Sequence, residues 1–413
     1  MNKKLLIIGF VWPEPNSTAA GSRMLQLIEV FQKYMYEITF VSAASQNKNS
    51  YSLDKLNIKT FDIELNNSGF DNIAKKIDPS IVLFDRFLTE EQFGWRIAEN
   101  CPNALRILDT EDLHFLRKAR HEAYKNKEKA SMKYLVNELT KREIACIYRC
   151  DLSLIISKYE FSLLTNTFKV DAILLIYLPF LLDNIKENKF GSFPRFKERK
   201  NFMTIGNFKH EPNLNSVLYL KNVIWPMIRK KLPKTQIHVY GSYATNKVQQ
   251  IHNEKEGFIV KGRADNAEDV FKNSKVCLAP LNFGAGLKGK LIDAMLYGTP
   301  SITTSIGAEA MHENLPWNGF IADDIKEFVN KSIDLYCNEE IWLRAQKNSV
   351  AIINQCYDKN LFGDQLLDRI KIIQKNIKDH RLRNFTGAML MHHTLQSTKY
   401  LSKWIEEKNT HVK

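Results

Sequence analysis

The chain has 413 residues, of which 44% are hydrophobic and 25% are charged, and its formal net charge is +13. This composition is typical of a globular protein with room for two or three domains. No apolar run approaches the ~18 residues that a membrane-spanning helix needs. The apolar start, residues 1–12, is followed by Pro13 and Pro15 rather than by a small-residue cleavage site, which favours a buried first strand over a signal peptide.

The six cysteines are scattered along the chain, and none forms a CxxC pair. This spacing predicts neither a disulfide framework nor a zinc site, and it fits the reducing cytoplasm. We therefore expect a cytoplasmic protein without a metal site.

The positive charge is concentrated in two segments. Residues 117–133 hold seven basic and two acidic residues, and residues 371–413 hold nine basic and three acidic residues. One interpretation is two solvated helix faces, and the other is docking to an anionic membrane surface from its inner, cytoplasmic face. No nucleic-acid-binding motif is present, so we do not expect nucleic acid as a partner.

The first part of the chain alternates short apolar segments with amphipathic helices. Such a βαβα rhythm predicts a mostly parallel sheet covered by helices on both faces. The expected strands are residues 5–10, 38–42, 80–84, 105–108, 151–156 and 174–178. The expected helices are residues 24–34, 90–99 and a long polar helix over 116–149.

A charged segment at residues 183–200 contains Gly191, Ser192 and Pro194 and is the best candidate for a linker. A second rhythm follows, with expected strands at 201–205, 236–240, 257–260, 275–279 and 300–304. From about residue 325 the chain is expected to be helical. The predicted division is a first Rossmann-like domain at 1–182, the linker, a second Rossmann-like domain at 201–345 and a helical region at 346–413.

The loop and helix at residues 282–300 concentrate the most informative residues of the chain. A glycine-rich loop between a strand and a helix lets backbone N–H groups approach an anion, and the helix N-terminus adds positive partial charge. Two lysines supply full charges for two phosphates, and an acid one turn later is placed to accept hydrogen bonds from ribose hydroxyls. The residues concerned are Gly284, Gly286, Lys288, Lys290 and Asp293.

This stretch resembles the donor-binding segment of the GT-B glycosyltransferases, in particular family 4, the group 1 transferases. The residues that carry the resemblance are Ala279-Pro280, Phe283-Gly284, Lys288, Asp293-Ala294-Met295, Gly298-Thr299-Pro300 and the loop ending in Gly307-Ala308-Glu309. The resemblance covers residues 201–311 and implies an α/β fold of two Rossmann-like domains facing a cleft, with a C-terminal helical extension.

The resemblance also implies further donor-binding residues. In the second domain these are Gly206, Lys209, Gly262, Arg263 and Glu309. In the first domain, the resemblance implies a role for the loop before the first helix. There Gly21 is expected to donate a backbone N–H group to the ligand, and Arg23 is expected to pair with a phosphate. The alternative for this loop is an ordinary connection in which Ser22 caps the helix.

The chain departs from the family pattern at the paired acids. The family has two glutamates eight positions apart, whereas this chain has Ala285 and Asp293. The family's arginine and lysine in the loop that opens the second domain are matched only imperfectly by Lys209 and His210. Neutralisation of the diphosphate is therefore expected to depend on Lys288 and Lys290.

The segment Asp109–His114 places three carboxylates and a histidine just after a buried strand. The resemblance implies that His114 approaches the transferred sugar, with Asp112 orienting it or contacting the acceptor hydroxyl. We assign His114, Asp112 and Lys288 as the candidate catalytic residues. The alternative is that Asp109 caps a helix and that His114 is merely exposed. A divalent-metal site in this segment is not expected, because the sequence offers no second cluster of ligands to complete it.

The resulting hypothesis is a glycosyltransferase that moves a sugar from a nucleotide sugar to a saccharide or lipid-linked acceptor. The resemblance implies retention of configuration, no cofactor and no metal, and a role in glycan or surface polysaccharide biosynthesis. One alternative is a catalytically silent GT-B relative that binds a nucleotide sugar or glycan as a partner protein. A third option is a non-transferring GT-B relative such as an epimerase.

Overall fold

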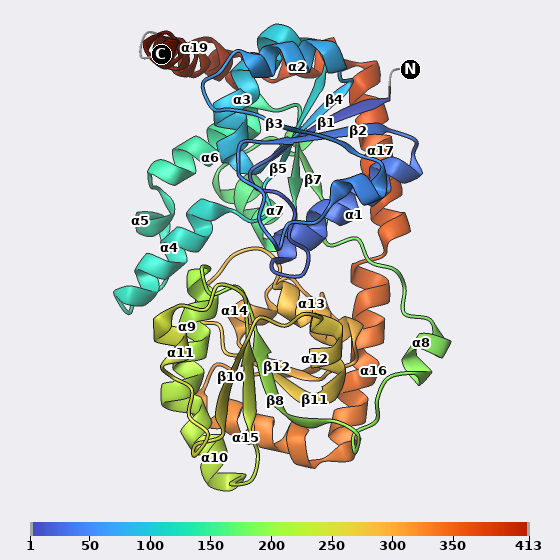
Figure 1. Cartoon of the computed structure of the whole chain (residues 1–413), viewed down its shortest axis with the longest axis vertical. Coiled ribbons are helices and arrows are strands. Elements are labelled where there is room, and N and C mark those ends of the chain that lie inside the picture. The colour runs from blue at the N-terminus through green and yellow to red at the C-terminus, as the bar shows by residue number, and fades with distance from the viewer. Residues whose placement is uncertain (1–2, 411–413) are drawn as a thin grey trace.

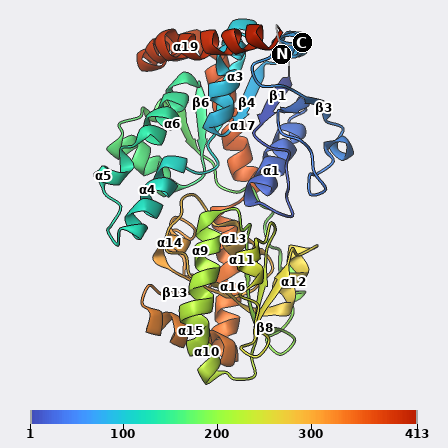
Figure 2. The ribbon, with the colours of Figure 1, turned by 60° about the vertical axis from the view of Figure 1, so that its left-hand side comes forward.

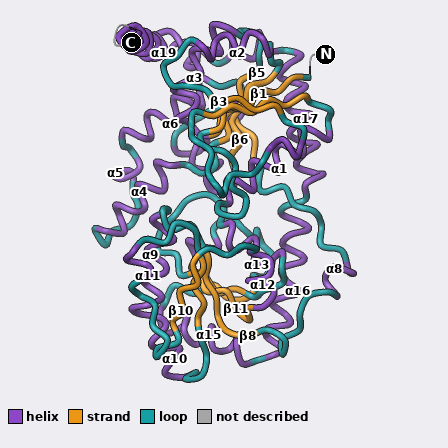
Figure 3. Tube along the Cα trace, viewed as in Figure 1, coloured by secondary structure: helices purple, strands orange, loops and turns teal. Residues whose placement is uncertain are grey.

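The computed structural model describes residues 3–410, with the side chains of residues 393–395 excepted. Two parallel sheets lie one beyond the other along the longest axis of the molecule (Figure 1). Helices surround each sheet, as the tube in Figure 3 shows. The two Rossmann-like domains and the helical C-terminal region predicted from the sequence are confirmed.

The first sheet has seven parallel strands in the order β3-β2-β1-β4-β5-β6-β7. Its central strands are buried on both faces: Leu6 and Ile8 of β1 point into one core, and Leu5 and Ile7 point into the other. The strands are β1 (Lys4–Gly9), β2 (Glu37–Ser42), β3 (Lys59–Asp62), β4 (Ile81–Asp85), β5 (Leu105–Asp109), β6 (Leu152–Ile155) and β7 (Leu175–Tyr177).

Helices cover both faces of this sheet. They are α1 (Ala19–Lys33), α2 (Gly69–Ile77), α3 (Arg86–Asn100), α4 (His114–Lys125), α5 (Met132–Leu135), α6 (Glu138–Arg149) and α7 (Lys158–Ser162). Short 3₁₀ and π turns complete the domain at Leu53–Leu56, Leu163–Thr167 and Ala172–Leu174.

The second sheet has six parallel strands in the order β10-β9-β8-β11-β12-β13. The strands are β8 (Lys200–Ile205), β9 (Ile237–Tyr240), β10 (Phe258–Gly262), β11 (Ser274–Ala279), β12 (Ser301–Thr303) and β13 (Gly319–Ile321). The helices are α9 (Glu211–Tyr219), α10 (Trp225–Lys231), α11 (Asn246–Gln249), α12 (Ala267–Asn273), α13 (Gly289–Leu296), α14 (Ser305–Ala308), α15 (Ile325–Cys337) and α16 (Glu339–Cys356), with a π turn at Leu220–Ile224.

The chain then returns to the first domain through α17 (Lys359–Lys375), α18 (Ile377–Arg383) and α19 (Phe385–Thr410). The apolar face of α17 is part of the first-domain core, where Leu366 and Ile370 are fully buried. Figure 1 shows α17 beside the first sheet and α16 beside the second. The last helix, α19, packs on α3 and α6.

The chain crosses between the domains twice, and the two crossings are bonded to each other. The segment that leaves the first domain contains α8 (Glu187–Gly191). At its start, Leu182 N–H donates to the Tyr357 carbonyl at 2.8 Å, and Lys359 N–H donates to the Leu182 carbonyl at 2.9 Å. The outgoing and returning segments therefore form one short two-stranded junction.

Three sequence expectations were wrong. Strands β3 and β13 were missed because each is a short edge strand whose side chains are mostly not fully buried. The single helix expected over residues 116–149 is three helices, α4, α5 and α6. The last of these restarts at Asn137, whose side chain forms a capping box with Thr140.

Among the residues that the structure describes, no helix has both the length and the apolar character needed to cross a membrane.

The burial of α17 leads to a stability prediction. Leu366→Ala removes a fully buried side chain from the first-domain core, and we expect a loss of about 2–5 kcal/mol in the free energy of unfolding. Leu361→Ala on the same helix is the matched control, because Leu361 is 51% exposed, and it should change stability by less than about 0.5 kcal/mol. Urea unfolding followed by circular dichroism measures both, and equal effects would contradict the packing of α17.

Candidate functional site

The N-termini of two helices from different domains meet at the domain interface. Helix α1 begins at Ala19 after the first strand, and α13 begins at Gly289 after β11. A Cβ atom added to Gly289 would lie only 2.5 Å from the Cβ of Ala19. Each helix N-terminus carries positive partial charge and unpaired N–H groups, so their convergence creates a site that favours an anion.

Two lysines flank this point. Burial lowers the pKa of both Lys288 and Lys290 to about 8. The Lys288 ammonium donates to the Gly286 carbonyl at 2.7 Å, and Glu309 opposes the fall of its pKa. Within residues 3–410, no carboxylate lies within ion-pair distance of the Lys290 ammonium.

One helical turn beyond Lys290, Asp293 lies in a similar environment. Burial raises the pKa of its carboxyl group to about 7. No hydrogen bond or ion pair of this side chain is found in the described part of the chain. Lys290 and Asp293 are half-buried on one helix, and no side chain in the described part of the chain bonds to either of them. They are suited to a ligand that supplies an anion and a hydroxyl donor.

The structure corrects the role predicted for Arg23. Its side chain is fully buried and forms an ion pair with Asp109, with Nη2 3.0 Å from Oδ1. Its Nη1 group donates to the carbonyls of Leu178 and Pro179, both at 2.9 Å. Because the guanidinium nitrogens of Arg23 are all bonded to partners within the first domain, the side chain does not contact a phosphate of the donor substrate. It instead joins β5 to the end of β7.

The predicted N–H donors Gly21 and Gly286 are also corrected. Gly21 N–H donates to the side chain of Thr18, so Thr18 caps α1 and not Ser22, which the alternative interpretation had given as the cap. Gly286 N–H donates to the buried carboxylate of Glu160 at 2.9 Å. Both groups are therefore already bonded within the protein, and Gly286 is needed because its φ of 61° is left-handed.

We call the loop before α13, residues 282–288, the donor loop after its predicted role, and an ion pair holds it together with Glu309 against the first domain. Arg120 of α4 makes a bidentate contact with Glu309, at 2.8 Å and 2.7 Å. The same guanidinium group donates to the Gly284 carbonyl at 2.8 Å. Gly284 and Glu309 thus lie beside Lys288, but the Glu309 carboxylate is already bonded to Arg120. The role of these two residues in donor binding stays a prediction.

Two of the three predicted catalytic side chains, His114 and Asp112, lie together at the same interface. His114 Nε2 is 3.5 Å from Asp112 Oδ1, and Asp112 is bonded to Arg117. Burial lowers the pKa of His114 to about 4 although Asp112 opposes the shift, so the imidazole is neutral near pH 7. Burial opposes ionisation of Asp112, but Arg117 and the two nearby histidines, His114 and His210, hold its pKa below its usual range.

The backbone at His114 is positioned by a buried acid from another helix. The Glu143 carboxylate of α6 accepts from the N–H groups of His114 and Phe115, both at 2.9 Å. Burial raises the pKa of Glu143 to about 8, and these two hydrogen bonds oppose the rise. The cap expected from Asp109 is therefore wrong, and Glu143 takes its place.

Sequence reasoning missed Arg117 and undervalued His210. Arg117 follows His114 by one helical turn, and this spacing was the only available signal. His210, in the loop that opens the second domain, influences the pKa of both Asp112 and His114 from the other side of the interface. Arg86 has a left-handed φ of 69° at the end of β4, a strained conformation that is common at functional sites.

The other predicted donor-binding residues lie on loops at the carboxyl edge of the second sheet. Gly206 packs against Asn213, and the Lys209 ammonium is 4.0 Å from the centre of the Tyr243 ring. Gly262 has a left-handed φ of 74°. Beside it is a hollow of about 310 Å³ lined by Ala244, Gln249, His252, Val260, Lys261 and Gly262. Arg263, next in the chain, is partly exposed and lies 3.5 Å from Asp265.

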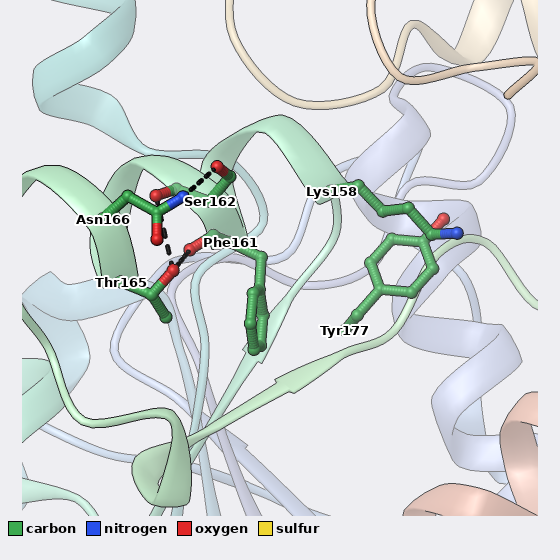
Figure 4. Close-up of a pocket in the computed structure, with 6 residues that line it drawn as sticks. All are labelled: Lys158, Phe161, Ser162, Thr165, Asn166 and Tyr177. Atoms are coloured by element: carbon green, nitrogen blue, oxygen red, sulfur yellow. Dashed lines mark hydrogen bonds between the residues drawn. The ribbon is translucent and has the colours of Figure 1, made fainter.

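The larger hollow, of about 410 Å³, lies on the first domain and contains none of the predicted site residues. Figure 4 shows Lys158 approaching the Tyr177 ring on one side, with Ser162, Thr165 and Asn166 on the other. The Asn166 amide donates to the Ser162 hydroxyl at 2.9 Å, so these polar groups are already paired.

Within residues 3–410, no group of three or more His, Cys, Asp or Glu side chains is placed to hold a metal ion.

Residues 199–338 match the family model of glycosyl transferases group 1. The Klebsiella pneumoniae relative, an uncharacterized 44.6 kDa protein in the cps region, is 25% identical over 177 residues, which cover 40% of this chain. The match spans only 44% of the length of that relative.

Solved structures with the same architecture cover most of the chain. A glycosyltransferase from Rickettsia africae has a TM-score of 0.65 at 13% identity, covering 90% of this chain and 99% of that one. A sucrose-phosphate synthase from Thermosynechococcus elongatus has a TM-score of 0.66 at 13% identity, with the same coverage. HepE of Anabaena, solved with UDP, has a TM-score of 0.64 at 11% identity and covers 89% of this chain and 99% of that one.

The fold is therefore that of the GT-B glycosyltransferases. Residues 199–338 of the second domain are similar to the domain of the group 1 glycosyl transferases.

The assignment of Arg23 to the first-domain core gives a prediction. Arg23→Gln leaves Asp109 as an uncompensated buried charge, and we expect a loss of about 3–5 kcal/mol in the free energy of unfolding. Arg263→Gln is the control, since its ion pair is partly exposed and its loss should cost less than about 1 kcal/mol. Thermal unfolding measures both. An unchanged melting temperature for Arg23→Gln would show that the arginine is not structural.

Proposed function

We propose that the protein transfers a sugar from a UDP-sugar to a hydroxyl group of a saccharide or lipid-linked acceptor. One observation carries the proposal: the N-termini of α1 and α13 converge beside Lys290, a desolvated cation without a carboxylate partner in the described chain. A diphosphate supplies the negative charge that this arrangement favours.

The choice of uracil as the nucleotide base is supported by the second domain and by the solved structures with the same fold. The hollow at Gly262 lies at the carboxyl end of β10, where a nucleotide base is accommodated in sheets of this kind. HepE of Anabaena has been solved with UDP and also with UDP and glucose. Asp293, half-buried and without a hydrogen-bond partner in the described part of the chain, is assigned to the ribose hydroxyls.

The proposed reaction breaks the bond between the sugar C1 and the diphosphate oxygen and forms a bond from C1 to the acceptor oxygen. The acceptor proton passes to the departing diphosphate. Lys288, Lys290 and the helix N-termini stabilise the negative charge that develops on the leaving group, so the proposal includes transfer without a metal. His114, neutral at pH 7, contacts the transferred sugar, and Asp112 orients it through the 3.5 Å contact.

Retention of configuration, absence of a cofactor, and action at the cytoplasmic face of a membrane complete the proposal. Retention rests on the resemblance to family 4. The relative from a cps region of Klebsiella pneumoniae supports a role in polysaccharide biosynthesis. EDTA treatment tests the metal-independent reaction, because a loss of activity that Mg²⁺ or Mn²⁺ restores would overturn this part of the proposal.

The donor assignment is tested with a panel of UDP-, GDP- and dTDP-sugars. We expect UDP-sugars to raise the melting temperature and to release UDP slowly by hydrolysis. Lys290→Met should weaken UDP-sugar binding by about 10–100-fold, the equivalent of one lost charged hydrogen bond. Lys230→Met, a surface lysine of α10, is the control and should leave binding unchanged.

Two outcomes would count against this assignment. If no nucleotide sugar shifts the melting temperature, the donor site is wrong. If UDP-sugars bind but release no UDP with any acceptor tested, the chain binds the nucleotide sugar without transferring it.

The pKa values of the site predict a narrow pH range for donor binding. Lys288 and Lys290, each with a pKa of about 8, are charged below that pH, so their attraction to the diphosphate is lost as the pH rises through 8. Asp293, with a pKa of about 7, accepts two hydroxyl donors only above that pH. Affinity for a UDP-sugar should therefore be highest between about pH 7 and 8.

Isothermal titration calorimetry across pH 6 to 9.5 would measure this profile. Asp293→Asn should remove the acidic limb and leave the basic limb in place. A dissociation constant that stays constant over the whole range would show that these three groups do not contact the donor.

A further inference from the structure

The last helix of the chain, α19, turns several large apolar side chains away from the first domain. Its inner side is held on the first domain by polar contacts: Arg96 donates to Ser402 and Glu406, and Lys399 pairs with Glu99. Gly387 allows the close approach, because a Cβ there would lie 2.2 Å from the Tyr148 carbonyl. A helix that covers a core normally turns its apolar face inward.

The outer side of the same helix carries the large apolar side chains. Those of Phe385, Tyr400 and Trp404 are 76%, 64% and 60% exposed. The spacing of Tyr400 and Trp404, like that of Phe385 and Met389, is four residues, which places each pair on one face. Leu382 of α18 extends this surface. We call Leu382, Phe385, Met389, Tyr400, Leu401 and Trp404 the α19 aromatic face.

Basic residues border this face. Arg383, Lys403 and Lys408 are exposed, and the Lys408 ammonium lies 5.3 Å from the centre of the Trp404 ring. Aromatic side chains flanked by lysine and arginine on a long exposed helix are typical of helices that lie in the interface of an anionic bilayer.

The position of α19 also suits a planar partner. The helix has 26 residues and lies across the end of the first domain that is remote from the second domain (Figures 1 and 2). Binding there leaves the interface with the donor loop uncovered. A second copy of the chain fits less well, because each copy carries a net charge of +13 and the two would repel each other.

We propose that the α19 aromatic face docks the protein on an anionic lipid surface, with Tyr400 and Trp404 inserted among the headgroups. This docking surface adds a contact site to the membrane location that is part of the proposed function, and only its biological context rests on that function. Apolar insertion and charge attraction act together, so binding needs both the aromatic side chains and the surrounding lysines.

Vesicle sedimentation of the full chain tests the proposal. Phosphatidylcholine vesicles containing about one-third phosphatidylglycerol should bind the protein at low salt, and pure phosphatidylcholine vesicles should bind it weakly. Phe385→Ser/Tyr400→Ser/Trp404→Ser and, separately, Lys403→Glu/Lys408→Glu should each reduce the partition coefficient at least about tenfold. Binding should fall steeply as salt is raised toward about 1 M.

Matched controls come from exposed residues of the second domain. Met227→Ser/Leu343→Ser removes exposed apolar side chains, and Lys230→Glu/Lys234→Glu makes the same change in net charge. Both should bind vesicles as the unmodified protein does. All variants should keep the melting temperature, because the changed side chains are exposed.

Three results would overturn the proposal. They are absence of binding to anionic vesicles, equal binding by the triple variant, and a dimer in light scattering that the triple variant converts to a monomer. The last result would assign the face to a second copy of the chain. Release of UDP from a UDP-sugar, measured without vesicles, should be the same in all these variants, which separates failure of the docking proposal from failure of the proposed function.

Discussion

The meeting of two positively polarised helix ends at Ala19 and Gly289 is the constraint on which the domain interface depends. Two such ends repel each other, so their approach requires negative charge nearby. The protein supplies part of that charge through Glu160, Glu309 and Asp112, which lie around the donor loop. Small side chains at the point of contact are equally necessary, because any Cβ at position 289 would collide with Ala19.

The polar groups of the interface divide into two sets by what satisfies them. Arg120, Glu309 and the Gly286 N–H group bond to one another or to Glu160 and hold the donor loop against the first domain. Lys290 and Asp293 are half-buried at the same interface, yet no described side chain bonds to either of them. The first set holds the two domains together, and the second set remains open to bonds from a ligand.

Local patterns were sufficient for most of the fold. Apolar segments bounded by turns located eleven of the thirteen strands, and the edge strands β3 and β13, which have no fully buried residue, escaped this signal. Lys288, Lys290 and Asp293 could be proposed together from the sequence because they lie within six residues on one loop and helix. Arg23 was misassigned because its partner, Asp109, lies 86 residues away in the sequence. His210 lies near His114 only because the two domains pack against each other. No local sequence pattern predicts such a contact.

The junction at Leu182, Tyr357 and Lys359 has a mechanical consequence. Two domains joined by one linker can swing and twist freely, but here both crossings pass through one hydrogen-bonded point. The bonded junction restrains sliding of the domains past each other at that point, so rotation about it is the motion that the two crossings permit most readily. A rotation of this kind that opened the interface would move the ends of α1 and α13 apart while the two crossings stayed together.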